Sequence, residues 1–243
     1  MAHGVFTGGW AANEEIEMTK HVANAAHELV TAPMVLYGHP GSGCTQKVLA
    51  MLAEKGAGAE IVLIDMSTGQ HKQDEHLARH PFGVIPALQI DSFMMYESRA
   101  IARYLDDRLP GASFIPAGGK ARALMEQWLS VEYSYLTPGQ SKIFMNRVVY
   151  PMMGAPIDEA AIATGIAQVR QVFAVLEQHL ADNIYLAGDS YSLADMTYLP
   201  ALFALQISGA GDLIAEFPNV AEWADLITNR PAWKKVLGMI PRW

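Results

Sequence analysis

The sequence predicts a mixed four-stranded α/β domain followed by an all-helical domain, and three observations support this order. A β-α-β pattern runs through residues 34–65. Two further short strands come after it, and beyond residue 119 only long amphipathic helical patterns remain. Strand signals in one half of a chain and helix signals in the other are typical of segregated layers around separate cores.

The individual elements are predicted from apolar periodicity and from the glycine, proline and polar residues that begin or end each helix and strand. In the first half we expect strands at 34–37, 59–65, 85–90 and 93–96, and helices at 45–55, ending at Gly56, and at 97–109. In the second half we expect helices at 120–149, 158–181 and 193–206, with shorter ones near 220–228 and 233–239. Ser192-Leu193-Ala194-Asp195 fits a capping box that starts the third of these, a folding role rather than a catalytic one.

The chain of 243 residues is longer than one domain usually is and suits two modest ones. We place the first domain at residues 34–110, a linker at 111–118 and the helical domain at 119–243. Residues 1–33 form an N-terminal extension to which we assign no function. A capped helix start at Asn13, or a loosely docked arm, would both fit its composition.

The charge and cysteine content of the chain bear on which partners and which compartment it suits. The net charge of −8 and the pI near 5.4 argue against nucleic acid and against an anionic membrane surface. A single cysteine excludes an internal disulfide and a Cys-x-x-Cys pair, which fits a reducing compartment such as the cytoplasm. The sequence shows neither a secretory signal nor a run long enough to span a bilayer, so we expect a soluble protein.

Residues 81–101 are the most informative segment. An Ile85-Pro86 bond can be cis at low cost, and a cis proline before a strand leaves the Ile85 amide and carbonyl open to an extended peptide. Glu97 and Ser98 fall at a strand-to-helix junction, where free amides and the helix dipole favour a carboxylate. Taken singly, Pro86 could mark a turn and Glu97-Ser98 could cap a helix.

This segment resembles the glutathione-binding half of the soluble glutathione transferases, whose thioredoxin-like domain carries a cis proline and a Glu-Ser pair. Residues 35–49, with the sequence VLYGHPGSGCTQKVL, resemble the first strand, serine loop and first helix of the phi-like class. Later landmarks of the family's helical domain are matched at 127–129, 141–144, 185–189, 192–195 and 230–233. The resemblance runs from about Met34 to the C-terminus.

The resemblance implies glutathione as co-substrate, no metal, and a homodimer. It assigns Ser42 as the catalytic hydroxyl that donates to the glutathione sulfur. It assigns glutathione binding to His71, Lys72, Val84, Ile85, Pro86, Glu97 and Ser98, with His71-Lys72 meeting the glycine carboxylate. Two departures stand out: many relatives carry Gln where this chain has Val84 and Asn where it has His80, which puts the strength of glutathione binding in question.

Two alternatives concern the serine loop, and one further prediction concerns the pocket. From the loop alone, Ser42 could be only a helix cap. Cys44 could be a nucleophile, as a cysteine is in related thiol-transfer members, but two positions beyond Ser42 we expect it to turn into the helix and be buried. The electrophile pocket is expected at the domain boundary, lined by His39, Pro40, Trp128, Tyr135 and Phe144.

The function predicted on these grounds is glutathione transfer: the thiol is activated as thiolate and conjugated to hydrophobic electrophiles, in the manner of a detoxification enzyme. A glutathione-dependent peroxidase or ether-cleaving activity could arise at the same site, since both start from the same thiolate. A different class is a non-catalytic ligand-binding or assembly module that keeps the fold; Val84 favours it, whereas Ser42 with Glu97-Ser98 opposes it.

Overall fold

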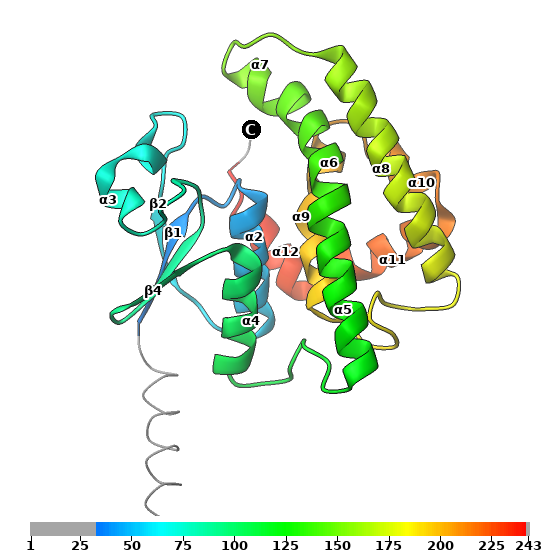
Figure 1. Ribbon diagram of the computed structural model, residues 1–243, viewed down its shortest axis with the longest axis horizontal. Helices are drawn as coiled ribbons and strands as arrows, with labels where there is room; N and C mark the ends of the chain where they lie inside the picture. Colours follow the sequence, from blue (N-terminus) through cyan, green and yellow to red (C-terminus); the bar gives the residue numbers. More distant parts are fainter. Residues whose placement is uncertain (1–32, 242–243) are drawn as a thin grey trace, which may run out of the picture.

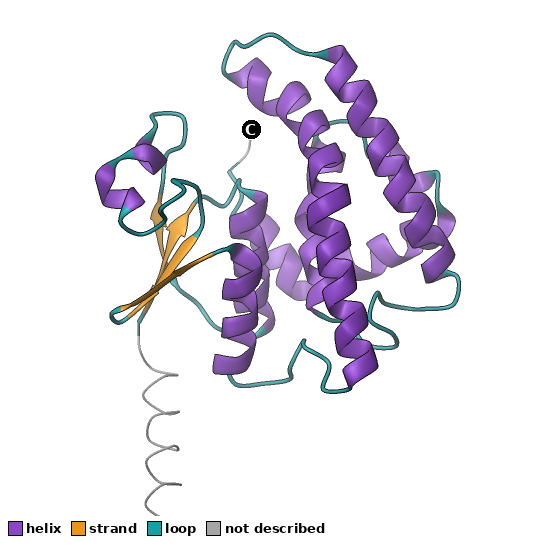
Figure 2. Ribbon diagram, in the orientation of Figure 1, coloured by secondary structure: helices purple, strands orange, loops and turns teal. Residues whose placement is uncertain are grey.

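The computed structural model describes residues 33–241 and places a small sheet domain beside a helical domain (Figure 1; Figure 2). The sheet domain contains β1 (Met34–Gly38), α2 (Gly43–Glu54), β2 (Glu60–Leu63), η1 (Gln70–Lys72), α3 (Asp74–Leu77), β3 (Ala87–Ile90), β4 (Phe93–Tyr96) and α4 (Ser98–Arg108). All four predicted strands and both predicted helices are present. The helix start predicted at Asn13 lies outside the described residues.

The sheet has the order β2-β1-β3-β4 and mixes both kinds of pairing. β1 runs parallel to β2 and antiparallel to β3, which in turn pairs antiparallel with β4. Leu36 of β1 lies opposite Leu88 of β3, and both are fully buried beneath the helices. Helices α2 and α4 lie between the sheet and the helical domain, so both helices that could carry a site face the domain boundary (Figure 1).

The helical domain begins with one continuous helical run rather than a single regular helix. The run comprises α5 (Gly119–Val131), η2 (Glu132–Leu136), α6 (Thr137–Phe144), η3 (Met145–Val149) and α7 (Tyr150–Met152). The segments η2 and η3 are π-helical turns, and each is followed within two residues by a proline, Pro138 or Pro151. Because proline cannot donate the usual backbone hydrogen bond, a locally widened turn lets the helix continue past it.

The remaining helices pack around this run. They are α8 (Glu159–Leu180), α9 (Leu193–Ile207), α10 (Asp212–Ala215), α11 (Pro218–Thr228) and α12 (Pro231–Leu237). The predicted capping box at the start of α9 is confirmed: Ser192 and Asp195 exchange side-chain-to-backbone hydrogen bonds, and both are buried. The Asp195 carboxylate also accepts from the Leu186 amide and the Trp223 indole, both at 2.9 Å. None of the helices in residues 33–241 is long and apolar enough to cross a bilayer.

One hydrophobic cluster joins the two domains. It includes Met51 of α2 and Leu105 of α4 from the sheet domain, and Phe173 and Trp233 from the helical domain, all essentially inaccessible. Helix α2 packs against both α9 and α12. This shared core fixes the position of the first turn of α2 relative to the helical domain, which is where the predicted site lies.

Candidate active site

The loop between β1 and α2 presents the Ser42 side chain at the start of a helix. The Ser42 amide donates to the His39 carbonyl at 2.8 Å, and the Gly41 amide donates to His39 Nδ1 at 3.0 Å, so the turn is closed by its own backbone and His39. Ser42 has extended backbone angles at the N-cap position, and its hydroxyl makes no capping hydrogen bond. The helix-cap alternative is therefore not realised, and the hydroxyl stands beside the unpaired first amides of α2.

The second part of the site is the segment that leads into β3. The Ile85-Pro86 peptide is cis, as predicted, and the first residue of β3 is Ala87. Among the described residues, the Ile85 amide and carbonyl enter no backbone hydrogen bond, so an extended ligand can pair with them. The Val84 carbonyl, by contrast, accepts from His76 Nε2 at 2.8 Å, and the Val84 side chain is exposed.

Glu97 and Ser98 lie where β4 ends and α4 begins. Glu97 has a φ of 74°, an unusual left-handed conformation for a residue with a side chain, which costs about 1 to 3 kcal/mol and is found disproportionately at functional sites. Ser98 is 3% exposed, and neither side chain caps the helix. The first amides of α4 are consequently left for an anionic group.

His71 and Lys72 form the short turn η1 against the loop before the cis proline. Lys72 Nζ donates to the Phe82 carbonyl at 3.1 Å. Gly83 has a φ of +56°, and a Cβ there would lie 2.8 Å from the His71 carbonyl oxygen, so only glycine allows this close approach. Burial, with Lys72 and His76 nearby, lowers the pKa of His71, so its imidazole is neutral at pH 7.

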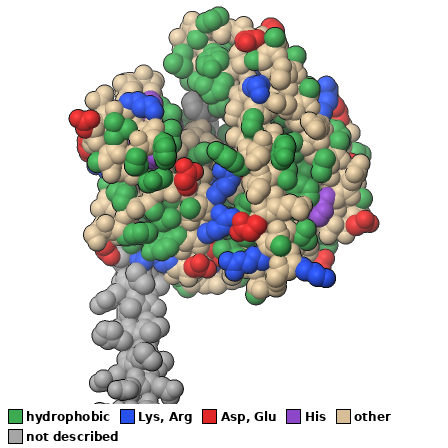
Figure 3. All heavy atoms as spheres, viewed as in Figure 1, with side chains coloured by type: hydrophobic (Ala, Val, Ile, Leu, Met, Phe, Trp, Pro, Cys, Tyr) green, Lys and Arg blue, Asp and Glu red, His purple; other side chains and the backbone are tan. Residues whose placement is uncertain are grey.

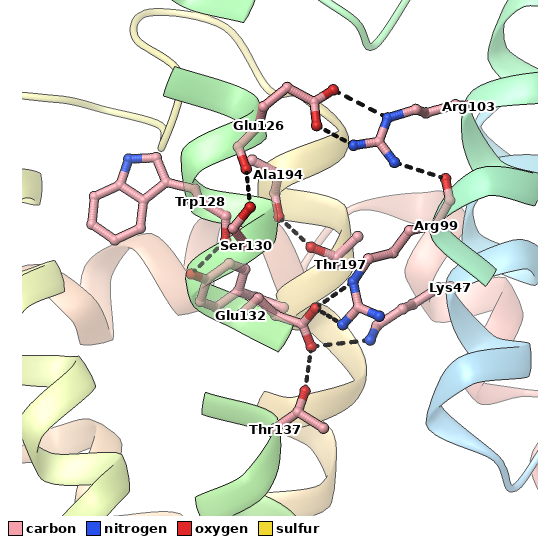
Figure 4. A network of polar contacts seen from close by, with 11 residues as sticks. Lys47, Arg99, Arg103, Glu126, Trp128, Ser130, Glu132, Thr137, Ala194 and Thr197 are labelled. Atoms are coloured by element: carbon pink, nitrogen blue, oxygen red, sulfur yellow. Dashed lines mark hydrogen bonds and ion pairs between the residues drawn. The ribbon is translucent and has the colours of Figure 1, made fainter. Parts of the chain in front are cut away.

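The two domains meet at a buried ionic network for which the sequence gives no pattern (Figure 4). Glu132, in the π turn η2, is 1% exposed and accepts from Lys47 of α2 at 3.0 Å and from Arg99 Nε of α4 at 2.9 Å. Thr137 Oγ1 donates to the same carboxylate at 2.7 Å. Burial acts to raise the pKa of Glu132, but Lys47, Arg99 and the Thr137 hydroxyl outweigh it and hold the pKa below its ordinary value.

This network connects Glu132 to α2, which begins directly after Ser42, and to α4, which begins at Ser98. The space-filling view shows basic and acidic side chains along the seam between the domains (Figure 3). The partners are 85 and 33 residues apart in the chain, so no local pattern identifies them. The only sequence signal is a charged residue on the inward side of an amphipathic helix.

A cavity of about 160 Å³ opens beside Ser42, between α2, α6 and α9. Phe144, one of the residues expected in the electrophile pocket, lines it. Trp128 does not: its side chain is 3% exposed and its ring packs on His179 with ring centroids 4.7 Å apart. Tyr135 is 63% exposed, on the outside of the π turn, and is likewise absent from the lining.

His39 and Pro40 shape the cavity's entrance loop and are not part of its lining. His39 closes the serine turn, and the Pro40 carbonyl accepts from Gln46 Nε2 at 2.9 Å. Cys44 is exposed and lines the cavity together with Ser42, so its predicted burial is wrong. The reason is that the first turn of α2 borders the cavity, and only the later turns enter the core.

Comparison with known proteins agrees with this geometry. The family model for the glutathione S-transferase N-terminal domain matches residues 32–107, and that for the C-terminal domain matches residues 159–226. Glutathione S-transferase 3 of Zea mays is 40% identical over 86% of this chain and 96% of its own. Glutathione S-transferase F10 of Arabidopsis thaliana is 37% identical over 79% of this chain and 91% of its own.

Solved structures of glutathione transferases are also similar to this chain. Glutathione transferase F7 from Populus trichocarpa superposes with a TM-score of 0.81 at 36% identity, covering 86% of this chain and all of that one. Glutathione S-transferase I from maize, in complex with an atrazine glutathione conjugate, gives a TM-score of 0.80 at 31% identity over 86% and 98% of the two chains.

A thioredoxin-like sheet domain with a serine loop and a cis proline, followed by a helical domain, defines the class of enzyme. The chain belongs to the glutathione S-transferase family. Within that family it is phi-like, as its serine loop predicts.

Proposed function

We propose that this chain binds glutathione along Ile85-Pro86 and Glu97-Ser98, ionises its thiol beside Ser42, and conjugates the thiolate to small electrophiles in the adjoining cavity. The observation that carries the proposal is the free Ser42 hydroxyl at the N-terminus of α2, on the rim of that cavity. Support for glutathione as the ligand comes from the family membership and from the unpaired Ile85 backbone.

The Ser42 hydroxyl and the dipole of α2 can together stabilise the glutathione thiolate enough to ionise the thiol near pH 7. A free thiol has a pKa of about 8.5, and lowering it by about 2 requires about 2.7 kcal/mol of extra stabilisation of the thiolate. One hydrogen bond from the Ser42 hydroxyl to a charged sulfur contributes roughly 1.5 to 3 kcal/mol. The dipole of α2 adds about 0.3 to 1 kcal/mol, so the two together reach the required value.

The remaining roles in this proposal belong to His71, Lys72 and Val84, and to the amides at the start of α4. The exposed Lys72 ammonium supports binding of the glycine carboxylate, and the neutral His71 supplies a donor rather than a second charge. Val84 has no side-chain donor or acceptor, so pairing here depends on the neighbouring Ile85 backbone. The γ-glutamyl carboxylate is assigned to the first amides of α4, beside Ser98.

The test is the ultraviolet absorbance of the glutathione thiolate, titrated against the protein from about pH 5 to 9, on either side of the free thiol's pKa. In the wild type we expect a thiolate signal at pH 7. Ser42→Ala should raise the pKa of the bound thiol by about 1 to 2 and remove most of that signal at pH 7. Ser190→Ala, which changes an exposed serine remote from the loop, is the matched control and should leave the titration unchanged.

Glutathione that binds without any thiolate signal would refute this mechanism and favour the non-catalytic ligand-binding module. Conjugation with an unaltered thiolate pKa in Ser42→Ala would instead transfer the role to another donor, with the exposed Cys44 as the first to replace. Both results can be read from the same titration.

We further propose that the protein is a cytoplasmic homodimer with a detoxifying role. The family membership supports a dimer, as do the exposed Phe93 and Tyr133 side chains, 48% and 63% accessible. Tyr133 borders a groove between α4 and α5 that also contains Arg103 and Glu126. Light scattering should give twice the mass of the chain, and Tyr133→Glu should lower it if this groove is the interface.

A further inference from the structure

A buried histidine of α3 holds the segment that precedes the cis proline. His76 is 1% exposed, whereas Asp74 and Glu75 of the same short helix are exposed. Its Nε2 lies 2.8 Å from the Val84 carbonyl oxygen. Because a carbonyl oxygen can only accept a hydrogen bond, the imidazole must carry a proton on Nε2 and donate it to Val84.

This hydrogen bond also sets the direction of the next amide. The Val84 carbonyl and the Ile85 N–H belong to one peptide unit, and that unit is trans, since the cis bond of this segment is Ile85-Pro86. In a planar trans peptide the C=O and N–H bonds point in opposite directions. A Val84 carbonyl that points toward His76 therefore directs the Ile85 N–H away from it, and this N–H has no backbone partner within residues 33–241.

The surroundings of His76 offer no other reason for a polar side chain. Its Nδ1 is buried and has no hydrogen-bond partner among the described residues. Its ring centroid lies 6.4 Å from that of His80. Burying an imidazole with one unpaired nitrogen costs free energy that an apolar side chain in the same place would not cost. The bond to the Val84 carbonyl is thus what histidine supplies here and an apolar residue could not.

We propose that His76 is a positioning residue for glutathione, an inference that rests on the proposed function. By holding the Val84 carbonyl, it keeps the Ile85 N–H directed at the backbone of an extended ligand before that ligand arrives. A segment that already has its bound conformation loses less conformational freedom on binding, so the affinity is higher. The buried His76 side chain neither contacts the ligand nor takes part in ionising the thiol.

The test compares His76→Phe with His76→Gln in the full-length protein. Phenylalanine fills the buried site without a donor, whereas glutamine keeps a side-chain N–H. Calorimetry at neutral pH gives the Kd of glutathione and that of S-methylglutathione, which has no thiol. We expect His76→Phe to raise both Kd values roughly 3- to 10-fold, the effect of one hydrogen bond, and His76→Gln to recover most of the affinity.

His179→Phe is the matched control. The Nε2 of His179 also lies within hydrogen-bond distance of a backbone carbonyl, that of Leu186 at 3.1 Å, but His179 belongs to α8 in the helical domain. Its replacement should lower the stability without changing either Kd. The thiolate pKa of bound glutathione, read from ultraviolet absorbance at saturation, should be the same in the wild type and in His76→Phe, because Ser42 is unaltered.

Several outcomes would overturn the inference. Equal Kd values in the wild type and in His76→Phe would do so. An equal loss of affinity in His76→Gln would assign the effect to side-chain shape, and an equal loss in His179→Phe would assign it to general destabilisation. If His76→Phe does not fold, as its circular dichroism would show, His76→Met replaces it, since methionine lacks a donor and adapts to irregular spaces.

The two measurements separate this inference from the proposed function. A wild type that binds glutathione without a thiolate signal would refute the activation at Ser42, and the Kd values of the His76 variants would still decide the positioning role. A wild type that binds neither glutathione nor S-methylglutathione would overturn both.

Discussion

Replacing Glu132 by glutamine should destabilise the protein strongly, because it removes the central carboxylate of the buried network. Glu132 is 1% exposed, and the side chains of its partners Lys47 and Arg99 are 5% and 16% exposed. The introduced glutamine would still fill the space and accept from Thr137, but Lys47 would be left as a buried cation without its counter-charge. Breaking a buried pair in this way costs about 3 to 5 kcal/mol.

The assay is reversible urea unfolding and the midpoint of thermal unfolding. For a chain of this length, about 2 to 4 °C is lost per kcal/mol, so Glu132→Gln should lower Tm by roughly 6 to 20 °C. Glu126→Gln is the matched control in the same helical run. Glu126 pairs with Arg103 in a partly exposed geometry, 45% and 31% accessible, and exposed pairs contribute only about 0 to 1 kcal/mol.

The pH dependence of stability is a second test of the role of the Glu132 carboxylate. The pKa of Glu132 is lower in the folded state than in the unfolded state, so its contribution is complete above about pH 4.5 and is lost as the pH falls through the folded value. The stability difference between the wild type and Glu132→Gln should therefore shrink below about pH 4.5. A loss of less than about 1 kcal/mol at pH 7, equal to that of Glu126→Gln, would refute the reasoning, since it would mean that water screens the network as it does a surface pair.

Two further predictions concern the capping box and the histidine beside the cis-proline segment. Ser192→Ala should cost about 1 to 2 kcal/mol of unfolding free energy without changing glutathione affinity, because it removes a helix cap and a buried donor to Asp195; unaltered stability in urea would count against this role. Burial, against the opposing effect of Glu97, lowers the pKa of His80, so the unfolded chain binds a proton more readily and stability should fall as the pH drops below about 6.5. His80→Asn should reduce the loss of Tm between about pH 7.5 and 5.5, and an identical loss in the variant would exclude His80 as its source.

Much of the fold could be predicted because it depends on local signals. Apolar alternation located the four strands, and the run 192–195 located the start of α9 from four residues. The cis proline and the Glu97-Ser98 junction were predictable for the same reason, since each is defined by immediate neighbours in the chain. The π turns before Pro138 and Pro151 were missed, because helical periodicity is nearly the same on both sides of a widened turn.

The pocket was predicted less well, and Trp128 shows why. Its position in the helix is equally compatible with a core residue and with a cavity wall. In the folded chain its ring packs against His179, away from the cavity. Cys44 was placed wrongly because local spacing does not show that the first turn of α2 borders an opening.

The order of the elements, the serine loop, the cis-proline strand and the membership of the glutathione S-transferase family can all be read from the amino-acid sequence. Those properties are encoded by contiguous residues and short-range backbone chemistry. Three others required the folded chain: that Lys47, Arg99 and Glu132 meet, that α2, α6 and α9 enclose a cavity beside Ser42, and that Trp128 lies outside it. These depend on contacts between segments far apart in the chain, and they exist only once α2 and α4 have packed against the helical domain.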